Sequence, residues 1–175
     1  TVIGVVANPF PVKGLNYFIQ AAAAILREYE KVHFVIVGKG TQDDELRRQA
    51  TELGVAERTL FAGQCEDVRP YLQAFDIAVL CSLSEGFSNA ILEYMAMGLP
   101  VVATSVGGSP EQVRADVTGF LIPPGDSEAL ENALLSLIRD ENLRATMSEA
   151  ALDRCRREFS LEKMIARMEE FYLRL

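Results

Sequence analysis

Histidine and cysteine are scarce in this sequence of 175 residues, which has one histidine and three cysteines. His33 opens a predicted strand without a catalytic companion, so we expect it to pack rather than to react. Cys65, Cys81 and Cys155 lie far apart and show neither metal-ligand spacing nor a disulfide framework. We therefore expect no metal site, no Ser/His/Asp or Cys/His centre, and a reducing compartment.

Long apolar runs and a targeting segment are also missing from the pattern. No apolar run approaches the roughly 18 residues of a membrane-spanning helix. The first residues, TVIGVVAN, read as a strand rather than as a signal peptide. A strand from residue 2 indicates an excised domain or an unusually compact protein. We expect a cytoplasmic chain whose contact with a membrane, if there is one, is peripheral and at the cytoplasmic face.

Positive charge is outweighed by negative charge, and the formal net charge is −8. This balance argues against non-specific binding to nucleic acid or to an anionic membrane surface, although a local positive spot could still hold a phosphate. Hydrophobic residues at 49% and charged residues at 24% are normal for a soluble globular protein. The length fits a single domain over residues 1–175.

Strand and helix patterns alternate along the chain. Predicted strands cover residues 1–7, 34–37, 59–62, 77–81, 99–103 and 118–123. Predicted helices cover residues 15–30, 43–53, 68–74, 90–97, 126–139, 141–157 and 161–175, and a turn with Ser109 as N-cap and Pro110 at the first helical position begins another. This alternation predicts an α/β fold, a Rossmann-like parallel sheet with helices on both faces and a helical C-terminal extension.

Ligands of such open sheets bind beyond the carboxyl ends of the strands. Four predicted loops leave those ends, at residues 8–14, 38–41, 82–88 and 105–109, and all contain glycine and polar residues. We therefore expect the functional site at this edge of the sheet.

The stretch from 76 to 104 carries the most specific signal, because an acid interrupts an apolar helix. Apolar residues cover almost the whole circumference of residues 90–97, so we expect a buried helix with Glu93 inside it. A buried carboxylate is costly unless it is paired. Glu93 shares a face with Asn89, towards the loop edge, and could accept two hydroxyl hydrogens from a cis-diol such as a ribose. The alternative is a Glu93 that faces solvent or stabilises its own helix start.

The turn before this helix could seat a phosphate. The free N–H groups near Ser88 to Ala90 form a natural anion site, and Gly86 lets backbone approach a ligand closely. Glu85 stands just outside that seat, although an acid in a turn is usually only solvated. Lys13, before Gly14, lies at the same edge and can supply positive charge to a diphosphate.

Established phosphate-loop motifs are absent. The run Gly38-Lys39-Gly40 starts like a dinucleotide fingerprint, but Asp43 holds the third glycine position and the run follows the second strand. No GxxxxGK[ST] pattern exists either.

The run SEGFSNAILEYMAMGLPVVATSVGGSPE closely resembles the signature of the retaining family 4 (group 1) glycosyltransferases, with their E-x7-E motif at Glu85 and Glu93. ANPFPVKG resembles that family's phosphate-binding loop, and GFLIPPGD resembles its downstream pattern. The resemblance spans nearly the whole chain but covers only the C-terminal, donor-binding half of a two-domain GT-B fold. In the family the last helix, here about 161–175, crosses back to the N-terminal acceptor domain.

The resemblance implies a role for each matching position in binding a nucleotide-diphosphate sugar. Glu93 would bind the ribose hydroxyls, and Glu85 would face the transferred sugar. Lys13, followed by Gly14, would stabilise the diphosphate leaving group. The base would lie beside Cys65. The reaction implied is hexosyl transfer with retained configuration and no essential metal or cofactor.

Backbone N–H groups complete the implied donor site. Those of Gly86, Phe87 and Ser88 would contact the sugar, and those of Asn89 and Ala90 the diphosphate. One departure concerns the first loop, where the family usually has an arginine and this chain has Asn8; weaker phosphate binding, or compensation from elsewhere, is then expected.

Two other functions remain open at this stage. One is a GT-B nucleotide-sugar epimerase or phosphorylase-like enzyme, although such epimerases favour histidines that this chain lacks. The other is a non-catalytic nucleotide-sugar binding module, because the acceptor, whether glycan, lipid or small molecule, would bind through the missing N-terminal domain.

Overall fold

The computed structural model describes residues 1–174, and within them one parallel sheet of six strands forms the centre of the molecule. The strands lie in the order β3-β2-β1-β4-β5-β6, and every neighbouring pair is parallel. Their bounds are β1 Val2–Val6, β2 His33–Val37, β3 Thr59–Gly63, β4 Ile77–Leu80, β5 Val101–Thr104 and β6 Gly119–Ile122. This is a Rossmann-like sheet, so the predicted fold class is confirmed.

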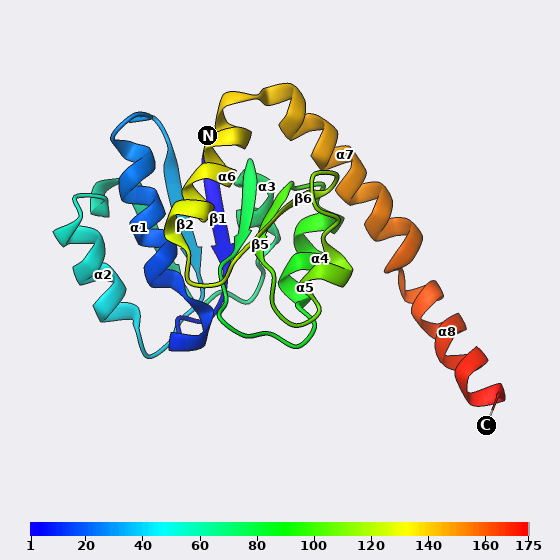
Figure 1. Cartoon of the computed structure of the whole chain (residues 1–175). Coiled ribbons are helices and arrows are strands. Elements are labelled where there is room, and N and C mark those ends of the chain that lie inside the picture. Colours follow the sequence, from blue (N-terminus) through cyan, green and yellow to red (C-terminus); the bar gives the residue numbers. More distant parts are fainter. Residues whose placement is uncertain (175) are drawn as a thin grey trace.

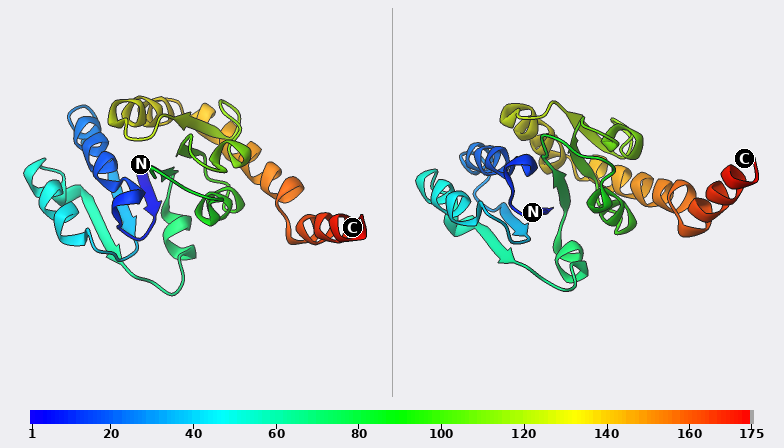
Figure 2. Two further views of the ribbon diagram at one scale, coloured as in Figure 1. Left: turned by 60° about the horizontal axis from the view of Figure 1, so that its bottom comes forward. Right: turned by 90° about the horizontal axis from the view of Figure 1, so that it is seen from below.

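Helices cover both faces of the sheet (Figure 1, Figure 2). Their bounds are α1 Leu15–Leu26, α2 Asp43–Glu52, α3 Arg69–Ala74, α4 Asn89–Ala96, α5 Ser109–Gln112, α6 Ser127–Arg139, α7 Glu141–Glu158 and α8 Leu161–Leu173. Helices α1, α2 and α6 pack on one face, and α3 and α4 pack on the other, where α5 lies against α4. Helix α7 contacts both apolar clusters, through Met147 on the first face and Ala151 on the second.

Alternation along the strands divides the core into two apolar clusters. On β4, Ile77 and Val79 belong to the cluster under α1 and α6, whereas Ala78 and Leu80 belong to the cluster under α4. All four residues of β4 are buried, as expected for a central parallel strand that is covered on both faces. The strand ends are therefore held firmly, and the loops that leave them start from fixed points.

The first helix is shorter than its sequence pattern predicts. The predicted helix runs to residue 30, but α1 ends at Leu26. Beyond it, Arg139 of α6 donates hydrogen bonds to the Glu28 carboxylate at 3.0 Å and to the Tyr29 hydroxyl at 2.9 Å. These contacts hold Glu28 and Tyr29 against α6, and the chain then turns back into β2.

The predicted cap of α5 is wrong by one position. Gly108 is the N-cap, and Ser109 is already the first helical residue, with Pro110 behind it. The Gly108 N–H donates to the Gly86 carbonyl oxygen at 2.6 Å, which fixes the start of α5 one residue earlier. Within residues 1–174, the buried Ser109 hydroxyl finds no hydrogen-bond partner.

The last helix, α8, extends away from the body of the molecule (Figure 1). Its apolar side chains are exposed, for example Met168 at 50% and Phe171 at 62%. The predicted helix over residues 161–175 is thus present through Leu173, and residue 175 lies outside the described residues. None of the described helices is long and apolar enough to span a bilayer.

Candidate functional site

The strand order reverses between β1 and β4, and the loops that follow these two strands meet at the carboxyl edge of the sheet. In open α/β sheets this reversal point is where ligands bind, because the flanking loops diverge to opposite faces. Residues 8–14 follow β1, and residues 81–88 follow β4. The right panel of Figure 2 looks onto this edge.

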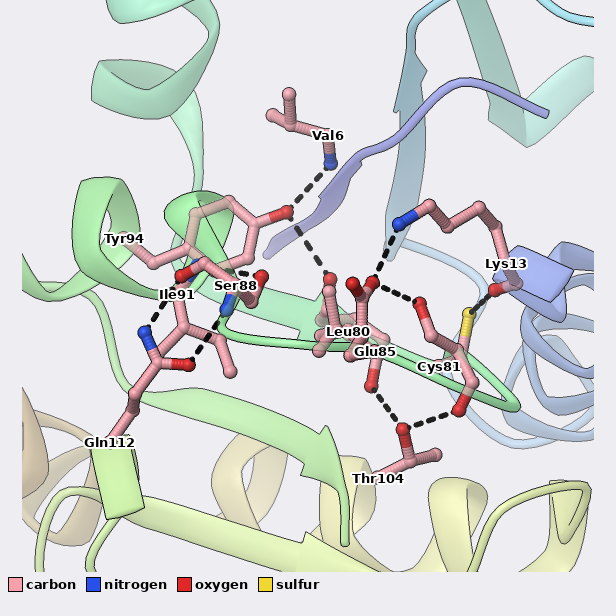
Figure 3. A network of polar contacts seen from close by, with 12 residues as sticks. Val6, Lys13, Leu80, Cys81, Glu85, Ser88, Ile91, Tyr94, Thr104 and Gln112 are labelled. Carbon is pink, nitrogen blue, oxygen red and sulfur yellow. Dashed lines mark hydrogen bonds and ion pairs between the residues drawn. The ribbon is translucent and has the colours of Figure 1, made fainter. Parts of the chain in front are cut away.

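Lys13 and Glu85 form an ion pair across the reversal point (Figure 3). Lys13 Nζ lies 2.6 Å from Glu85 Oε1, and only 26% and 12% of the two side chains are exposed. Ser82 Oγ donates to the same carboxylate oxygen at 2.7 Å. The two loops, 72 residues apart, thus place a cation and an anion at one point.

The first loop lies against the second through backbone contacts. The Leu83 N–H donates to the Val12 carbonyl oxygen at 2.7 Å, and Cys81 Sγ donates to the Lys13 carbonyl oxygen at 3.4 Å. Gly14 has φ 63°, and a Cβ there would overlap the Cys81 carbonyl oxygen. This position therefore requires glycine, which lets the chain pass close to β4 before α1 begins.

Thr104, at the end of β5, supports the second loop from below. Its hydroxyl lies 2.6 Å from the Ser82 carbonyl oxygen and 3.4 Å from that of Leu80, and its side chain is buried. The Ser82 backbone is held by this bond while its hydroxyl binds Glu85. The loop after β4 therefore fixes the Glu85 carboxylate through Ser82, and Thr104 of β5 supports that loop. Lys13 reaches the carboxylate from the loop after β1.

The hydroxyl of Tyr94 links α4 to both strands at the reversal point. It accepts a hydrogen bond from the Val6 N–H at 2.7 Å and donates to the Val79 carbonyl oxygen at 3.3 Å. Burial raises the pKa of Tyr94 far above its ordinary value, so the hydroxyl stays neutral and available as a donor. The direct β1–β4 pairing covers only Ile3 and Gly4 on β1, and the tyrosine bridges the strands beyond it.

Replacing Tyr94 with phenylalanine is therefore expected to destabilise the fold by about 1–2 kcal/mol, because two buried backbone groups lose their partner while the ring remains. Chemical denaturation at neutral pH measures this change in the free energy of unfolding. Tyr17→Phe is the control, since that tyrosine is only partly buried and should change little. Equal effects of the two substitutions would contradict the bridging role.

Helix α4 begins beside the Lys13–Glu85 pair. Ser88 is the N-cap, and its hydroxyl accepts from the Ile91 N–H at 3.4 Å. The N–H groups of Asn89 and Ala90 lie in the first turn, where no intrahelical acceptor exists for them. These groups and the positive end of the helix dipole favour a negatively charged ligand here.

Helix α4 is not buried all round, contrary to expectation. It packs through Ile91, Tyr94 and Met95, whereas Asn89 and Glu93 are both exposed. The expected burial of Glu93 is therefore wrong, and its side chain is accessible to solvent and to a ligand. Enough protein still surrounds the Glu93 carboxyl to raise its pKa by desolvation. Asn89 and Glu93 share one face, as predicted, so that face offers an amide and a carboxylate.

A second glycine contact closes the turn between Glu85 and α4. Gly107 has φ 50°, and a Cβ there would overlap the Glu85 carbonyl oxygen. Gly86 and Phe87 form this turn and are themselves exposed. The loop after β5 thus packs against one side of this turn, and the other side is exposed to solvent.

The remaining predicted positions lie further from the pair. Asn8 is exposed, and its side-chain oxygen accepts from the Lys39 N–H at 3.4 Å, which joins the loops after β1 and β2. Cys65 follows the edge strand β3 and packs partly buried against the apolar cluster under α3 and α4. In residues 1–174 no hydrogen bond links Cys65 to the other predicted residues.

Sequence reasoning did not identify Ser82, Tyr94, Thr104 or Gln112, whose carboxamide hydrogen-bonds the Ser88 backbone, as site residues. The only signal for Ser82 is its position three residues before Glu85. The other three act through long-range contacts with backbone groups, and such contacts leave no local pattern.

An apolar groove lies between α4, α5 and α8, and it reaches the turn before α4 through Phe87. Its volume is about 480 Å³, and its walls include Phe87, Leu92, Phe159 and Phe171. Apolar side chains dominate it, and neither Lys13 nor Glu93 lines it. The one cation among its lining residues is Arg167, which shares the groove with the carboxylates of Glu111 and Glu158, so we place the candidate site for an anion at the reversal point.

The comparison with known families fits this geometry. The model of the family "Glycosyl transferases group 1" matches residues 1–140. The chain belongs to the group 1 glycosyltransferases. It is 31% identical over 167 residues to the N-acetyl-alpha-D-glucosaminyl L-malate synthase of Bacillus anthracis, an alignment that covers 95% of this chain and 44% of that protein. This chain thus spans less than half the length of that curated relative.

Solved structures of group 1 glycosyltransferases share the fold. The C-terminal domain of the Francisella tularensis glycosyl transferase LpcC superposes with a TM-score of 0.85 at 30% identity, over 91% of this chain and 86% of that one. Anabaena HepE in complex with UDP superposes with a TM-score of 0.92 at 31% identity, over 99% of this chain and 49% of that one. The fold is therefore that of a C-terminal GT-B domain.

Proposed function

We propose that this chain binds the donor of a hexosyltransferase, a nucleotide-diphosphate sugar, at the carboxyl edge between β1 and β4. The observation that carries the proposal is the Lys13–Glu85 pair at 2.6 Å beside the start of α4. A cation, a carboxylate and free helix N–H groups are the chemistry that a diphosphate and a sugar together need.

Each part of the donor has a proposed partner. The diphosphate takes the first-turn N–H groups of Asn89 and Ala90, with Lys13 as its cation. The ribose lies against Glu93, on the exposed face of α4, and the base extends towards Cys65. The transferred sugar then faces Glu85. In this order the breaking sugar–phosphate bond lies beside the Lys13–Glu85 pair, where charge develops on the leaving group.

The identity of the donor rests on chemistry shared with related proteins. Anabaena HepE has been solved in complex with UDP and in complex with UDP-glucose. We propose a nucleoside diphosphate sugar of the same class for this chain, with transfer that retains the anomeric configuration. The cytoplasm, where such donors would meet a reduced protein with three free cysteines, is the proposed location.

The acceptor site requires a second half that this chain does not contain. Helix α8 presents Met164, Met168 and Phe171 without covering partners in residues 1–174. We propose that an N-terminal acceptor domain covers this face and supplies the other wall of the cleft. The 175-residue chain would then be the donor domain of a larger GT-B enzyme.

A panel of UDP, GDP and ADP with their sugars tests donor binding by thermal shift. At about 100 times Kd, a ligand that binds only the folded chain adds about 2.7 kcal/mol of stability, or roughly 5–10 °C in Tm for a domain of this size. We expect this shift for one base and little change with the matching nucleoside. No shift with any of the three diphosphates would contradict the proposal.

The isolated chain is expected to transfer almost no sugar, even where it binds the donor, because the acceptor wall is absent. Product formation from a radiolabelled donor, followed by chromatography, measures this directly. Addition of the N-terminal half in one polypeptide should restore transfer. Robust transfer by the 175 residues alone would show that the acceptor site lies within them.

A further inference from the structure

The short helix α5 holds a buried glutamine against the start of α4. The Gln112 side chain is 0% exposed, and its carboxamide makes two hydrogen bonds with the Ser88 backbone (Figure 3). The Ser88 N–H donates to Gln112 Oε1 at 3.1 Å, and Gln112 Nε2 donates to the Ser88 carbonyl oxygen at 2.7 Å. The glutamine thus pairs with Ser88 as a neighbouring strand would.

This pair controls where α4 begins. The capping bond of Ser88 itself is long, with 3.4 Å between Ile91 N and Ser88 Oγ, and is correspondingly weak. The two shorter bonds from Gln112 therefore hold the N-cap more firmly than its own hydroxyl does. The N–H groups of Asn89 and Ala90 follow directly, so their direction depends on the backbone that Gln112 fixes.

Gln112 is held in place from behind by α7. Arg154 Nε donates to the Gln112 carbonyl oxygen at 3.0 Å, and its Nη2 donates to the Glu111 carbonyl oxygen at 2.8 Å. Arg154 also pairs with Glu158 at 3.0 Å. A chain of contacts therefore runs from α7 through the end of α5 to the N-cap of α4.

We propose that Gln112 is a positioning residue for the donor diphosphate, acting through the Ser88 backbone. Packing alone does not require a carboxamide here, because leucine would fill a similar volume. What leucine lacks is the ability to hold both polar groups of Ser88. The inference rests on the proposed function, since it concerns the N–H groups that we assign to the diphosphate.

The test compares Gln112→Leu with the wild-type chain by calorimetry, with UDP and uridine as the two probes. The ratio of their dissociation constants isolates the phosphate contribution, because both share the base and the ribose. We expect the variant to lose about tenfold more affinity for UDP than for uridine. If the wild-type chain prefers GDP or ADP, that nucleotide and its nucleoside replace this pair.

Ser109→Ala is the matched control, because Ser109 lies in the same short helix and is equally buried, with a hydroxyl that has no partner in residues 1–174. It should leave the ratio unchanged. Equal losses for UDP and uridine in Gln112→Leu would overturn the inference, since a merely structural role affects both alike. A wild-type chain that binds none of the three diphosphates would instead overturn the proposed function itself.

Gln112→Glu is the second variant that tests the positioning role, for use if Gln112→Leu does not fold. A protonated carboxyl offers one acceptor and one donor to Ser88, as the carboxamide does, whereas a carboxylate offers no donor. At each pH, the ratio of the dissociation constants for UDP and uridine in the variant is divided by the same ratio in the wild type. This quotient should return towards one as the pH falls. This division cancels the pH response that the two proteins share, including that of Glu93 and of the charged neighbours Glu111, Arg154 and Glu158. A ratio that does not recover at acid pH would overturn the inference.

Discussion

A Glu93→Ala variant is expected to bind UDP roughly 100-fold more weakly than the wild-type chain. An ionised carboxylate that accepts two ribose hydroxyls contributes hydrogen bonds to a charged group, and their loss is large because neither hydroxyl finds a replacement. The fold should lose little, since Glu93 is exposed and desolvation is the sole cause of its shifted pKa. Calorimetry and denaturation of the same samples separate the two effects.

The pH dependence of UDP binding provides an independent check on this role. The raised pKa of Glu93 means that its carboxyl takes up a proton at a higher pH than an ordinary glutamate does. The protonated form accepts the two hydroxyls less well, so UDP affinity should fall as the pH drops through that raised pKa. Glu93→Gln should remove this dependence and remain weak at every pH.

Glu149→Ala is the matched control, because it removes the same charge from an exposed position on α7. It should leave UDP affinity within about twofold, as most surface substitutions do. Equal weakening by Glu93→Ala and Glu149→Ala would show that only the overall charge matters. Unchanged affinity in Glu93→Ala would remove this residue from the ribose site.

Glu85→Gln, in a protein that carries both halves of the GT-B fold, is expected to lower turnover roughly 100- to 1000-fold with UDP affinity nearly intact. Glutamine keeps the shape of the side chain and an oxygen for the Ser82 hydroxyl, but it lacks the charge that pairs with Lys13. The loss should therefore fall on the step in which charge develops, not on nucleotide binding.

Steady-state kinetics with saturating acceptor give kcat and KM for the donor separately. Glu128→Gln serves as the control, since Glu128 is exposed on α6, on the opposite face of the sheet from α4. Its kcat should match that of the wild type. Normal turnover in Glu85→Gln would exclude Glu85 from the reaction, and a parallel rise in KM would assign it to binding instead.

The sequence predicts the layout of the site because that layout follows from topology. Lys13 and Glu85 each follow an apolar run, and the carboxyl ends of parallel strands share one edge. Their ion pair at 2.6 Å joins two loops whose meeting depends only on the strand order. Gly14 and Gly107 lie in two of the predicted loops, and the structure adds the close backbone approach that requires glycine there.

The supporting contacts could not be predicted, because they join residues that have no local relation. Gln112 belongs to no motif in the sequence, yet it is fully buried against Ser88. Glu93 reads as buried because its neighbours are apolar, but α4 packs through only one side and leaves Glu93 exposed. In both cases the partner across the fold decides the burial, and hydrophobic periodicity does not specify that partner.

A crystal structure of the chain with UDP tests the central claim most directly. We predict that the ribose hydroxyls lie within hydrogen-bonding distance of the Glu93 carboxylate. The diphosphate should contact Lys13 and the N–H groups of Asn89 and Ala90. UDP bound instead in the apolar groove beside Phe87 and α8, with Lys13 and Glu93 untouched, would contradict the account.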